Sequence, residues 1–166
     1  MTRLLCRTWD RGAHRAPVLL VVLMLSCLIG GPLRAQDPEL GLISGHEAWE
    51  LLQDAELVIV DVRTQTEWRE TGVAPGAARI SFYNIWAVPN DAFVEEVLAA
   101  LDGDRDRPVA LICATGGRSS KAARQLRESG FSHVADIAEG MQGSQAGIGW
   151  LSRALPIEHC GDCETF

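Results

Sequence analysis

The sequence predicts a single α/β domain with a central, mostly parallel sheet flanked by helices. Three aliphatic runs typical of buried strands alternate with segments typical of helices, which is the pattern of a parallel sheet. The chain has 166 residues, enough for one domain with a hydrophobic core. Its composition, with 47% hydrophobic and 22% charged residues, is that of an ordinary globular protein and excludes a largely disordered chain.

The N-terminal segment is expected to lie outside this domain. An arginine-rich head precedes an apolar run over residues 16–29, and glycine and proline then break the run. This order is typical of a secretory signal peptide. We therefore expect residues 1–35 to be a signal peptide cleaved after Ala35, and the protein to be exported to the periplasm. Two alternatives remain open: residues 16–29 stay as an anchor, or Cys27 is lipidated.

The run over residues 16–29 is short for a membrane span, which needs about 20 apolar residues. We therefore expect no stable span in the mature form. Because residues 1–35 contain five arginines and one aspartate, the remainder has a formal net charge of −11 rather than −7. Such an acidic surface repels nucleic acid, so no DNA or RNA partner is expected.

The first half of the domain begins after a short linker over residues 36–41. Ser44 with Glu47 three residues later is a capping box and predicts the start of a helix. The continuous aliphatic run Leu57–Val60 predicts a strand buried on both faces. A turn at Pro75-Gly76 is followed by a short strand expected over residues 78–82.

The second half repeats the alternation. An apolar stripe predicts a helix over residues 93–101, and Val109–Ile112 is a second buried strand. A helix is expected over Ser119–Glu128 and a third strand over Val134–Ile137. The glycine-rich residues 140–149 predict a loop.

The segment Cys113–Ser119 carries the predicted chemistry. It joins a buried strand to a helix, and in open α/β sheets ligands bind at that end of the strand. Adjacent glycines allow the loop to curl so that its N–H groups converge on an anion at the helix N-terminus. The expected cradle for an anion or persulfide consists of Ala114, Thr115, Gly116, Gly117, Arg118 and Ser119.

Cys113 lies at the floor of this cradle and is the candidate catalytic residue. Helix N-termini and cationic neighbours favour the thiolate form of a cysteine, which is the nucleophile. We expect a thiolate at neutral pH, with the Arg118 guanidinium as a permanent positive charge beside it. The alternative is an inert core thiol. A reactive thiol also has to be reachable from solvent.

These motifs resemble the rhodanese-like domain family. The family's Cys-x-x-Gly-x-Arg-Ser/Thr loop is matched by Cys113, Gly116, Arg118 and Ser119. Further matches in order along the chain are Asp61 and Arg63, Glu67 and Trp68, residues 72–77, Gly140-Met141 and Leu155-Pro156. The resemblance covers residues 42–158 and implies a three-layer rhodanese-like domain. It implies a sulfurtransferase that carries sulfane sulfur as a persulfide on Cys113 and needs no cofactor or metal.

The resemblance also implies a small sulfur donor and a thiol, cyanide or protein acceptor as partners. From Cys113 to Arg118 there are six residues, as in the family's sulfurtransferases, whereas its phosphatases have one more. Glu67 stands where thiosulfate-active members often have a second basic residue, which argues against a thiosulfate preference. We expect Asp61, Arg63 and Glu67 to brace the loop.

A second cysteine feature lies in the C-terminal tail, residues 159–166. Cys160 and Cys163 have the spacing of a short-range disulfide, a redox pair or half of a metal site. A disulfide is expected in an exported protein, and no second cysteine pair is present to complete a zinc site. A sharper hypothesis is that these thiols accept sulfur from Cys113.

Two function classes follow. The first is a sulfurtransferase that works by covalent catalysis on Cys113. The second is a non-catalytic rhodanese-like module that binds a periplasmic partner protein or carries sulfur to it.

Overall fold

The computed structural model describes residues 41–55 and 57–159, which belong to the unit Pro38–Phe166. The expected signal peptide, nearly all of the linker, and Cys160 and Cys163 lie outside the described residues. Within the part of the chain that is described, every helix is too short or too polar to cross a membrane.

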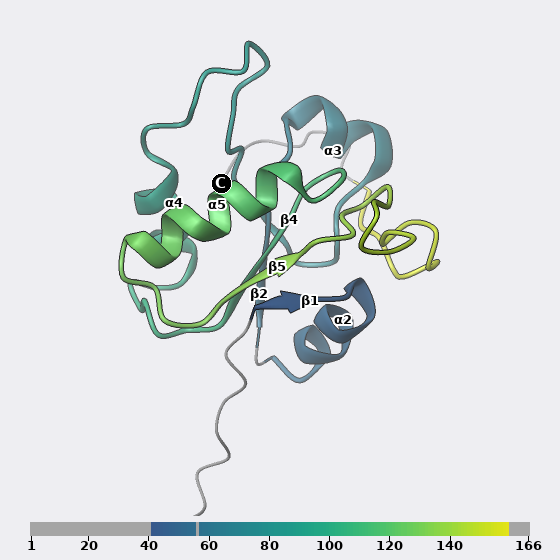
Figure 1. The fold of residues 1–166 in the computed structure, drawn as a ribbon, viewed down its shortest axis with the longest axis horizontal. Coiled ribbons are helices and arrows are strands. Elements are labelled where there is room, and N and C mark those ends of the chain that lie inside the picture. Colours follow the sequence, from purple (N-terminus) through teal and green to yellow (C-terminus); the bar gives the residue numbers. More distant parts are fainter. Residues whose placement is uncertain (1–40, 56, 160–166) are drawn as a thin grey trace, which may run out of the picture. The chain divides into compact units, whose positions relative to one another are not determined.

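Five parallel strands form one sheet, which confirms the predicted fold class (Figure 1). Their order in the sheet is β1-β5-β4-β2-β3, and β4 pairs with β2 on one side and β5 on the other. The strands are β1 (Leu42–Ile43), β2 (Val58–Asp61), β3 (Ala78–Arg79), β4 (Val109–Ile112) and β5 (Val134–Ile137).

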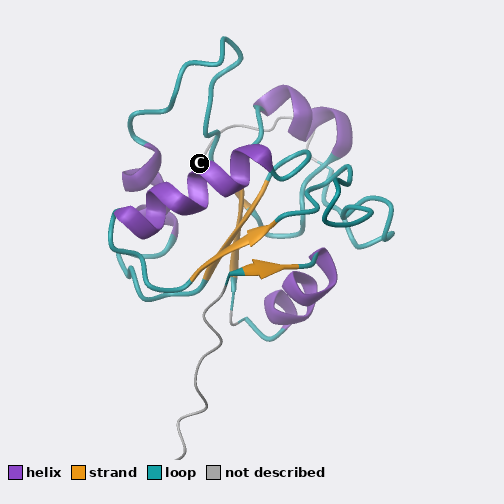
Figure 2. Ribbon diagram, viewed as in Figure 1, coloured by secondary structure: helices purple, strands orange, loops and turns teal. Residues whose placement is uncertain are grey.

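Helices lie on both faces of the sheet, as the alternation predicts (Figure 2). They are α2 (Gly45–Gln53), α3 (Gln65–Thr71), α4 (Phe93–Ala100) and α5 (Gly117–Glu128). Side chains of α4 and α5 share one hydrophobic core with one face of the strands, and side chains of α2 share a second core with the opposite face. These are the three layers of the domain.

The central strand β4 is buried along its whole length, as expected for a parallel strand covered on both faces. Because side chains alternate along a strand, Val109 and Leu111 enter the core under α4 and α5, and Ala110 and Ile112 enter the other core. Cys113 continues the first series and therefore lies on the α4/α5 side of the sheet.

Several element boundaries differ from the sequence-based expectation. The strand expected over residues 78–82 is confined to Ala78–Arg79. Helix α5 begins at Gly117 instead of Ser119, because Gly116 with φ +86° is its N-cap. Helix α3 and strand β1 were not predicted. The signal for α3 is a capping box of Thr64 and Glu67, the same device that begins α2 at Ser44.

Candidate active site

The loop after β4 is held at its start by the chain that follows β5. The carbonyl of Cys113 accepts a hydrogen bond from the backbone N–H of Met141 at 2.8 Å. The carbonyl of Ala114 accepts one from the N–H of Gln142 at 2.9 Å. A Cβ on Gly140 would lie 2.5 Å from the Ala114 oxygen, so this close approach requires glycine. The position of Cys113 is thus fixed by backbone contacts.

Gly116 turns the loop back toward the cysteine. Its φ of +86° is in the left-handed region, and an added Cβ would lie 2.2 Å from the carbonyl oxygen of Ala138. In this conformation its backbone N–H donates to the sulfur of Cys113 at 3.1 Å. Helix α5 starts at the next residue, and the first N–H groups of a helix have no acceptor within it. The sulfur therefore lies at the positive end of α5.

Ser119 supplies a second donor to the sulfur from the first turn of α5. Its side chain is fully buried, and its Oγ lies 3.5 Å from the Cys113 sulfur. The same Oγ lies 3.1 Å from the carbonyl oxygen of Gly116. The sulfur thus accepts from a backbone N–H and shares the single Ser119 proton with the Gly116 carbonyl, an arrangement that can stabilise negative charge on the sulfur.

Arg118 is engaged by Glu67 of α3. Its two terminal nitrogens donate to the two oxygens of the Glu67 carboxylate, at 2.7 and 2.5 Å. Burial raises the pKa of Glu67, but hydrogen bonds from Arg118 and Thr64 lower it more, so that the pKa is about 2. The hydrogen bond that Arg118 donates to Glu67 raises the pKa of Arg118 above its usual value. The positive charge beside the loop is therefore matched by a carboxylate.

Asp61 and Arg63 form a fully buried ion pair at the end of β2, with a shortest N–O distance of 2.6 Å. Arg63 also donates to the hydroxyl of Thr71 at 2.6 Å and to the carbonyl of Gly72 at 2.7 Å. These bonds fasten α3 to the sheet. Since α3 carries Glu67, the Asp61–Arg63 pair and the Arg118–Glu67 pair lie at the two ends of one short helix.

The thiol itself is nearly inaccessible in this conformation, because Cys113 is only 1% exposed. A reactive cysteine has to meet its substrate, so this burial does not match the expectation of a reachable thiol.

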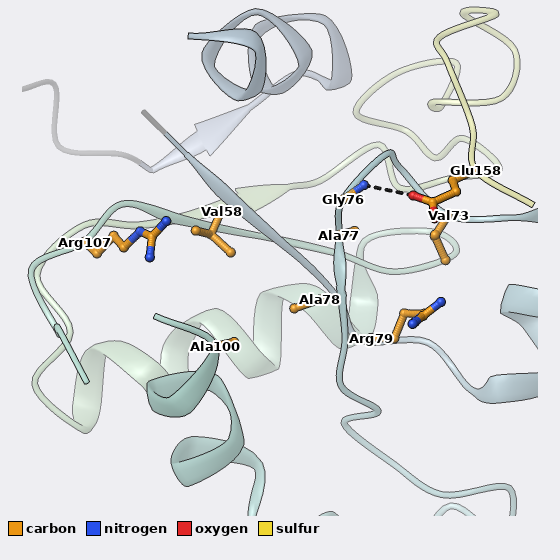
Figure 3. A pocket seen from close by; sticks show the side chains of 9 residues that line it. All are labelled: Val58, Val73, Gly76, Ala77, Ala78, Arg79, Ala100, Arg107 and Glu158. Atoms are coloured by element: carbon orange, nitrogen blue, oxygen red, sulfur yellow. Dashed lines mark hydrogen bonds between the residues drawn. The ribbon is translucent and has the colours of Figure 1, made fainter. Parts of the chain in front are cut away.

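A pocket beside the edge strand β3 does not belong to this site (Figure 3). Its lining includes none of residues 113–119. It is lined by Val58, Val73, Gly76, Ala77, Ala78, Arg79, Ala100, Arg107 and Glu158. In this pocket the Gly76 N–H donates a hydrogen bond to the Glu158 carboxylate at 3.2 Å, drawn as a dashed line in Figure 3.

Comparisons with known proteins agree with the geometry of the loop and the sheet. The sequence model of the rhodanese-like domain matches residues 44–146. The chain belongs to the rhodanese-like domain family. This assignment fits the five-stranded parallel sheet with helices on both faces.

Relatives with named activities are distant. The chain is 28% identical over 116 residues to the thiosulfate sulfurtransferase GlpE of Glaesserella parasuis, which covers 70% of this chain and 91% of that protein. It is 31% identical over 100 residues to GlpE of Coxiella burnetii, covering 60% and 82% of the two chains.

Solved structures share the fold. The crystal structure of Rv0390 from M. tuberculosis has a TM-score of 0.60 and 31% identity, and covers 72% of this chain and 98% of that one. A thiosulfate sulfurtransferase from Pseudomonas aeruginosa has a TM-score of 0.57 and 25% identity, with 76% of this chain but only 21% of that chain covered. The family therefore includes sulfurtransferases, and it uses sulfur donors and acceptors.

One buried charged residue near the loop was missed by sequence reasoning. Asp136 of β5 is 3% exposed, and its partner in the sheet register is Leu111, two residues before Cys113. The available signal was a charged residue inside the otherwise apolar run Val134–Ile137. Acidic residues are rarely fully buried without a partner, so this position warranted attention.

The conformation of Gly116 gives the first prediction. Gly116→Ala forces an L-residue into the left-handed region and a Cβ against Ala138, so we expect the unfolding free energy to fall by about 2 kcal/mol or more. Gly117→Ala is the matched control, because φ there is unexceptional and no atom lies within 4 Å of the added Cβ. Urea denaturation of both variants measures the difference. Equal stabilities would contradict the prediction.

The low pKa of Glu67 gives the second prediction. Since its pKa is about 2 in the folded protein against 4.5 as the reference value, the Arg118–Glu67 pair stabilises the fold above pH 4.5 and loses this effect as the pH falls toward 2. The full change in pKa corresponds to about 3 kcal/mol, and because solvent screens this partly exposed pair we expect roughly 2–3 kcal/mol. Glu67→Gln should remove that part of the pH dependence of unfolding.

The control for this measurement is Glu70→Gln, because Glu70 is an exposed residue of the same helix. Urea denaturation at a series of acidic pH values compares the two variants with the wild type. The role assigned to the ion pair is wrong if Glu67→Gln follows the wild-type pH profile.

Proposed function

We propose that this protein is a sulfurtransferase that carries sulfane sulfur as a persulfide on Cys113 and passes it to a thiol, cyanide or protein acceptor. The observation that carries the proposal is the pair of donors on one sulfur atom, the Gly116 N–H at 3.1 Å and the Ser119 hydroxyl at 3.5 Å. The distant similarity to thiosulfate sulfurtransferases supports the same chemistry.

The proposed reaction has two steps. The Cys113 thiolate attacks the outer sulfur of a donor R–S–S⁻, the S–S bond of the donor breaks, and RS⁻ leaves. The product is the anion Cys113–S–S⁻. An acceptor thiolate or cyanide then attacks the terminal sulfur, which breaks the Cys113 S–S bond and regenerates the thiolate. Both forms of the enzyme are anions, and donors fixed in place before the reaction stabilise each of them.

The charges near the loop favour a singly charged donor. The guanidinium groups of Arg63 and Arg118 are both paired with carboxylates. Neither pair leaves an uncompensated positive charge for a dianion such as thiosulfate, and the chain after residue 35 is strongly acidic. A persulfide donor has one negative charge fewer to bring to the sulfur. We therefore place organic persulfides ahead of thiosulfate as donors.

The burial of Cys113 favours a second candidate, a rhodanese-like module that binds a periplasmic partner protein or carries sulfur to it without turning over small molecules. At 1% exposure the thiol is poorly placed for free collision with substrates. A partner that moves the loop on docking would be needed to load or unload the sulfur.

Sulfur uptake separates these two candidates. The chain from residue 36 onward is incubated with cysteine persulfide or with thiosulfate, and its intact mass is measured. We expect a gain of one sulfur atom that cyanide removes as thiocyanate, and no gain in Cys113→Ser. If neither donor adds sulfur to the wild type, only the binding module remains.

The tail cysteines give a separate prediction, since the described chain ends at His159 close to α3. Glu158 pairs with Val73 through two backbone hydrogen bonds of 2.8 and 3.0 Å. Five residues beyond Glu158, Cys163 is within roughly 17 Å of it along an extended chain. We infer that these thiols take sulfur from Cys113. The persulfide sulfur is then reduced to hydrosulfide while Cys160 and Cys163 are oxidised to a disulfide.

In the prereduced protein, Cys160→Ser combined with Cys163→Ser should leave loading of Cys113 intact. Sulfide release without added thiol should be lost, and the mass decrease of two hydrogens that marks the disulfide should be absent. Sulfide release equal to that of the wild type would refute a role for the tail.

A further inference from the structure

A hairpin between β3 and α4, residues 83–89, carries apolar side chains into solvent. Trp86 is 79% exposed, Ile85 67% and Val88 52%. Figure 1 shows the connection between β3 and α4 projecting from the body of the described domain. Residues 80–90 contain no charged side chain. Single exposed apolar residues are ordinary, but several gathered at one place mark an interaction site.

The hairpin is held in one conformation by its own hydrogen bonds. The side-chain oxygen of Asn84 accepts from the backbone N–H groups of Trp86 and Val88, both at 2.9 Å. The backbone N–H of Asn84 donates to the Val88 carbonyl at 2.9 Å. Tyr83 and Pro89 form an antiparallel bridge at the base. Because the turn is ordered before any partner binds, it presents its apolar side chains at little further cost in entropy.

Acidic side chains flank the hairpin where the chain enters α4. Asp91 and Glu95 are both exposed. Among residues 41–55 and 57–159, no ion pair involves either of them. The neighbouring Glu96 accepts a hydrogen bond from the side chain of Asn90 at 2.9 Å. The surface that complements this region therefore combines apolar groups with positive charge.

Helix α5 of the same chain offers such a surface. Lys121 and Arg124 are three residues apart, so they lie on one side of the helix, and both are exposed. Within the described part of the chain, neither has an ion-pair partner. The aliphatic stems of lysine and arginine cover apolar groups, and their cationic ends are attracted to the face of a tryptophan ring. These two cations are exposed in a chain that is otherwise strongly acidic after residue 35.

Both surfaces belong to the same layer of the domain. The hairpin leads directly into α4, and α4 and α5 pack against the same face of the sheet. In a two-fold dimer every contact is made twice, because a patch of the first copy meets another patch of the second copy, and the reverse. Two copies that face each other through this layer can therefore join hairpin to α5 in both directions.

We propose that the hairpin of residues 83–89 docks on the exposed side of α5 of a second copy of this chain, forming a two-fold dimer. Trp86 packs on the stems of Lys121 and Arg124 of the second copy. The cationic ends of these two residues face the acidic side chains that flank the hairpin. The dimer does not depend on the sulfur chemistry of Cys113, so a failure of sulfur uptake leaves it untouched.

The first test measures the mass of the chain from residue 36 onward by sedimentation velocity, at roughly 1–300 µM protein. The wild type should form dimers as its concentration rises. Trp86→Ser should raise the dissociation constant of the dimer about tenfold or more, as loss of a buried aromatic anchor does. Ile148→Ser is the matched control, because Ile148 is 58% exposed in the loop after β5, and it should leave dimerisation unchanged. A monomeric wild type, or equal dimerisation of Trp86→Ser, would overturn the proposal.

The second test reverses the charge of one surface at a time. Asp91→Lys with Glu95→Lys makes both surfaces positive, and Lys121→Glu with Arg124→Glu makes both negative. Each double variant alone should dimerise about tenfold more weakly than the wild type or worse, because like charges then meet at both contacts. An equimolar mixture of the two should dimerise more tightly than either alone, since opposite charges meet again at both contacts. The absence of any gain on mixing would refute the pairing of hairpin with α5.

The alternative occupant of the hairpin is a lipid surface, since tryptophan also favours the interface between membrane and water. The chain from residue 36 onward is therefore sedimented with vesicles of phosphatidylcholine, whose surface has no net charge to repel an acidic protein. We expect the wild type to stay in the supernatant. Binding to the vesicles that Trp86→Ser abolishes would assign the hairpin to lipid and overturn the dimer. Circular dichroism checks that every variant is folded.

Discussion

The hydrogen bond from the Gly116 N–H to the sulfur of Cys113 is the contact on which the site depends. It exists only because Gly116 is left-handed, and that conformation brings its α-carbon against the carbonyl of Ala138 just after β5. The pairing of β4 with β5 and the bonds from Met141 and Gln142 fix the same region. The pairing of β4 with β5 therefore also fixes the position of the Cys113 sulfur.

Charge around the loop is balanced within the protein. Arg63 is neutralised by Asp61 and Arg118 by Glu67, in pairs of which the first is fully buried. A buried pair contributes little net stability, yet removing one partner leaves an uncompensated charge and is costly. The pairs therefore hold α3 and α5 in place. The groups in direct contact with the sulfur are a neutral N–H and a neutral O–H.

The sequence predicts the strands and helices that have a local residue pattern, and it misses those that form only through pairing with distant segments. The aliphatic runs gave β2, β4 and β5 nearly to the residue, because buried parallel strands are continuously apolar. Strand β1 has two residues and exists only through its pairing with β5, so no local pattern identifies it. Helix α3 is short and polar, and its capping box was the one available signal.

The residues of the site likewise fall into those that are adjacent in the chain and those that only the fold brings together. The cysteine, the glycines and Ser119 are adjacent in the chain, and their convergence follows from a strand-to-helix turn. Arg118 was expected to attract anions, but its partner Glu67 is 51 residues away in the sequence, and the ion pair follows from the placement of α3. The burial of Asp136 likewise depends on the placement of β5 beside β4.

The loop that carries Cys113 is held more firmly on the side of β5 than on the side of α3. On the β5 side, backbone hydrogen bonds and close glycine contacts fix Cys113, and moving them would disturb the sheet. On the α3 side, the loop is held by the partly exposed Arg118–Glu67 pair. A partly exposed ion pair costs less free energy to separate than a set of buried backbone hydrogen bonds. The Arg118–Glu67 pair is therefore the weaker of the two restraints on the loop.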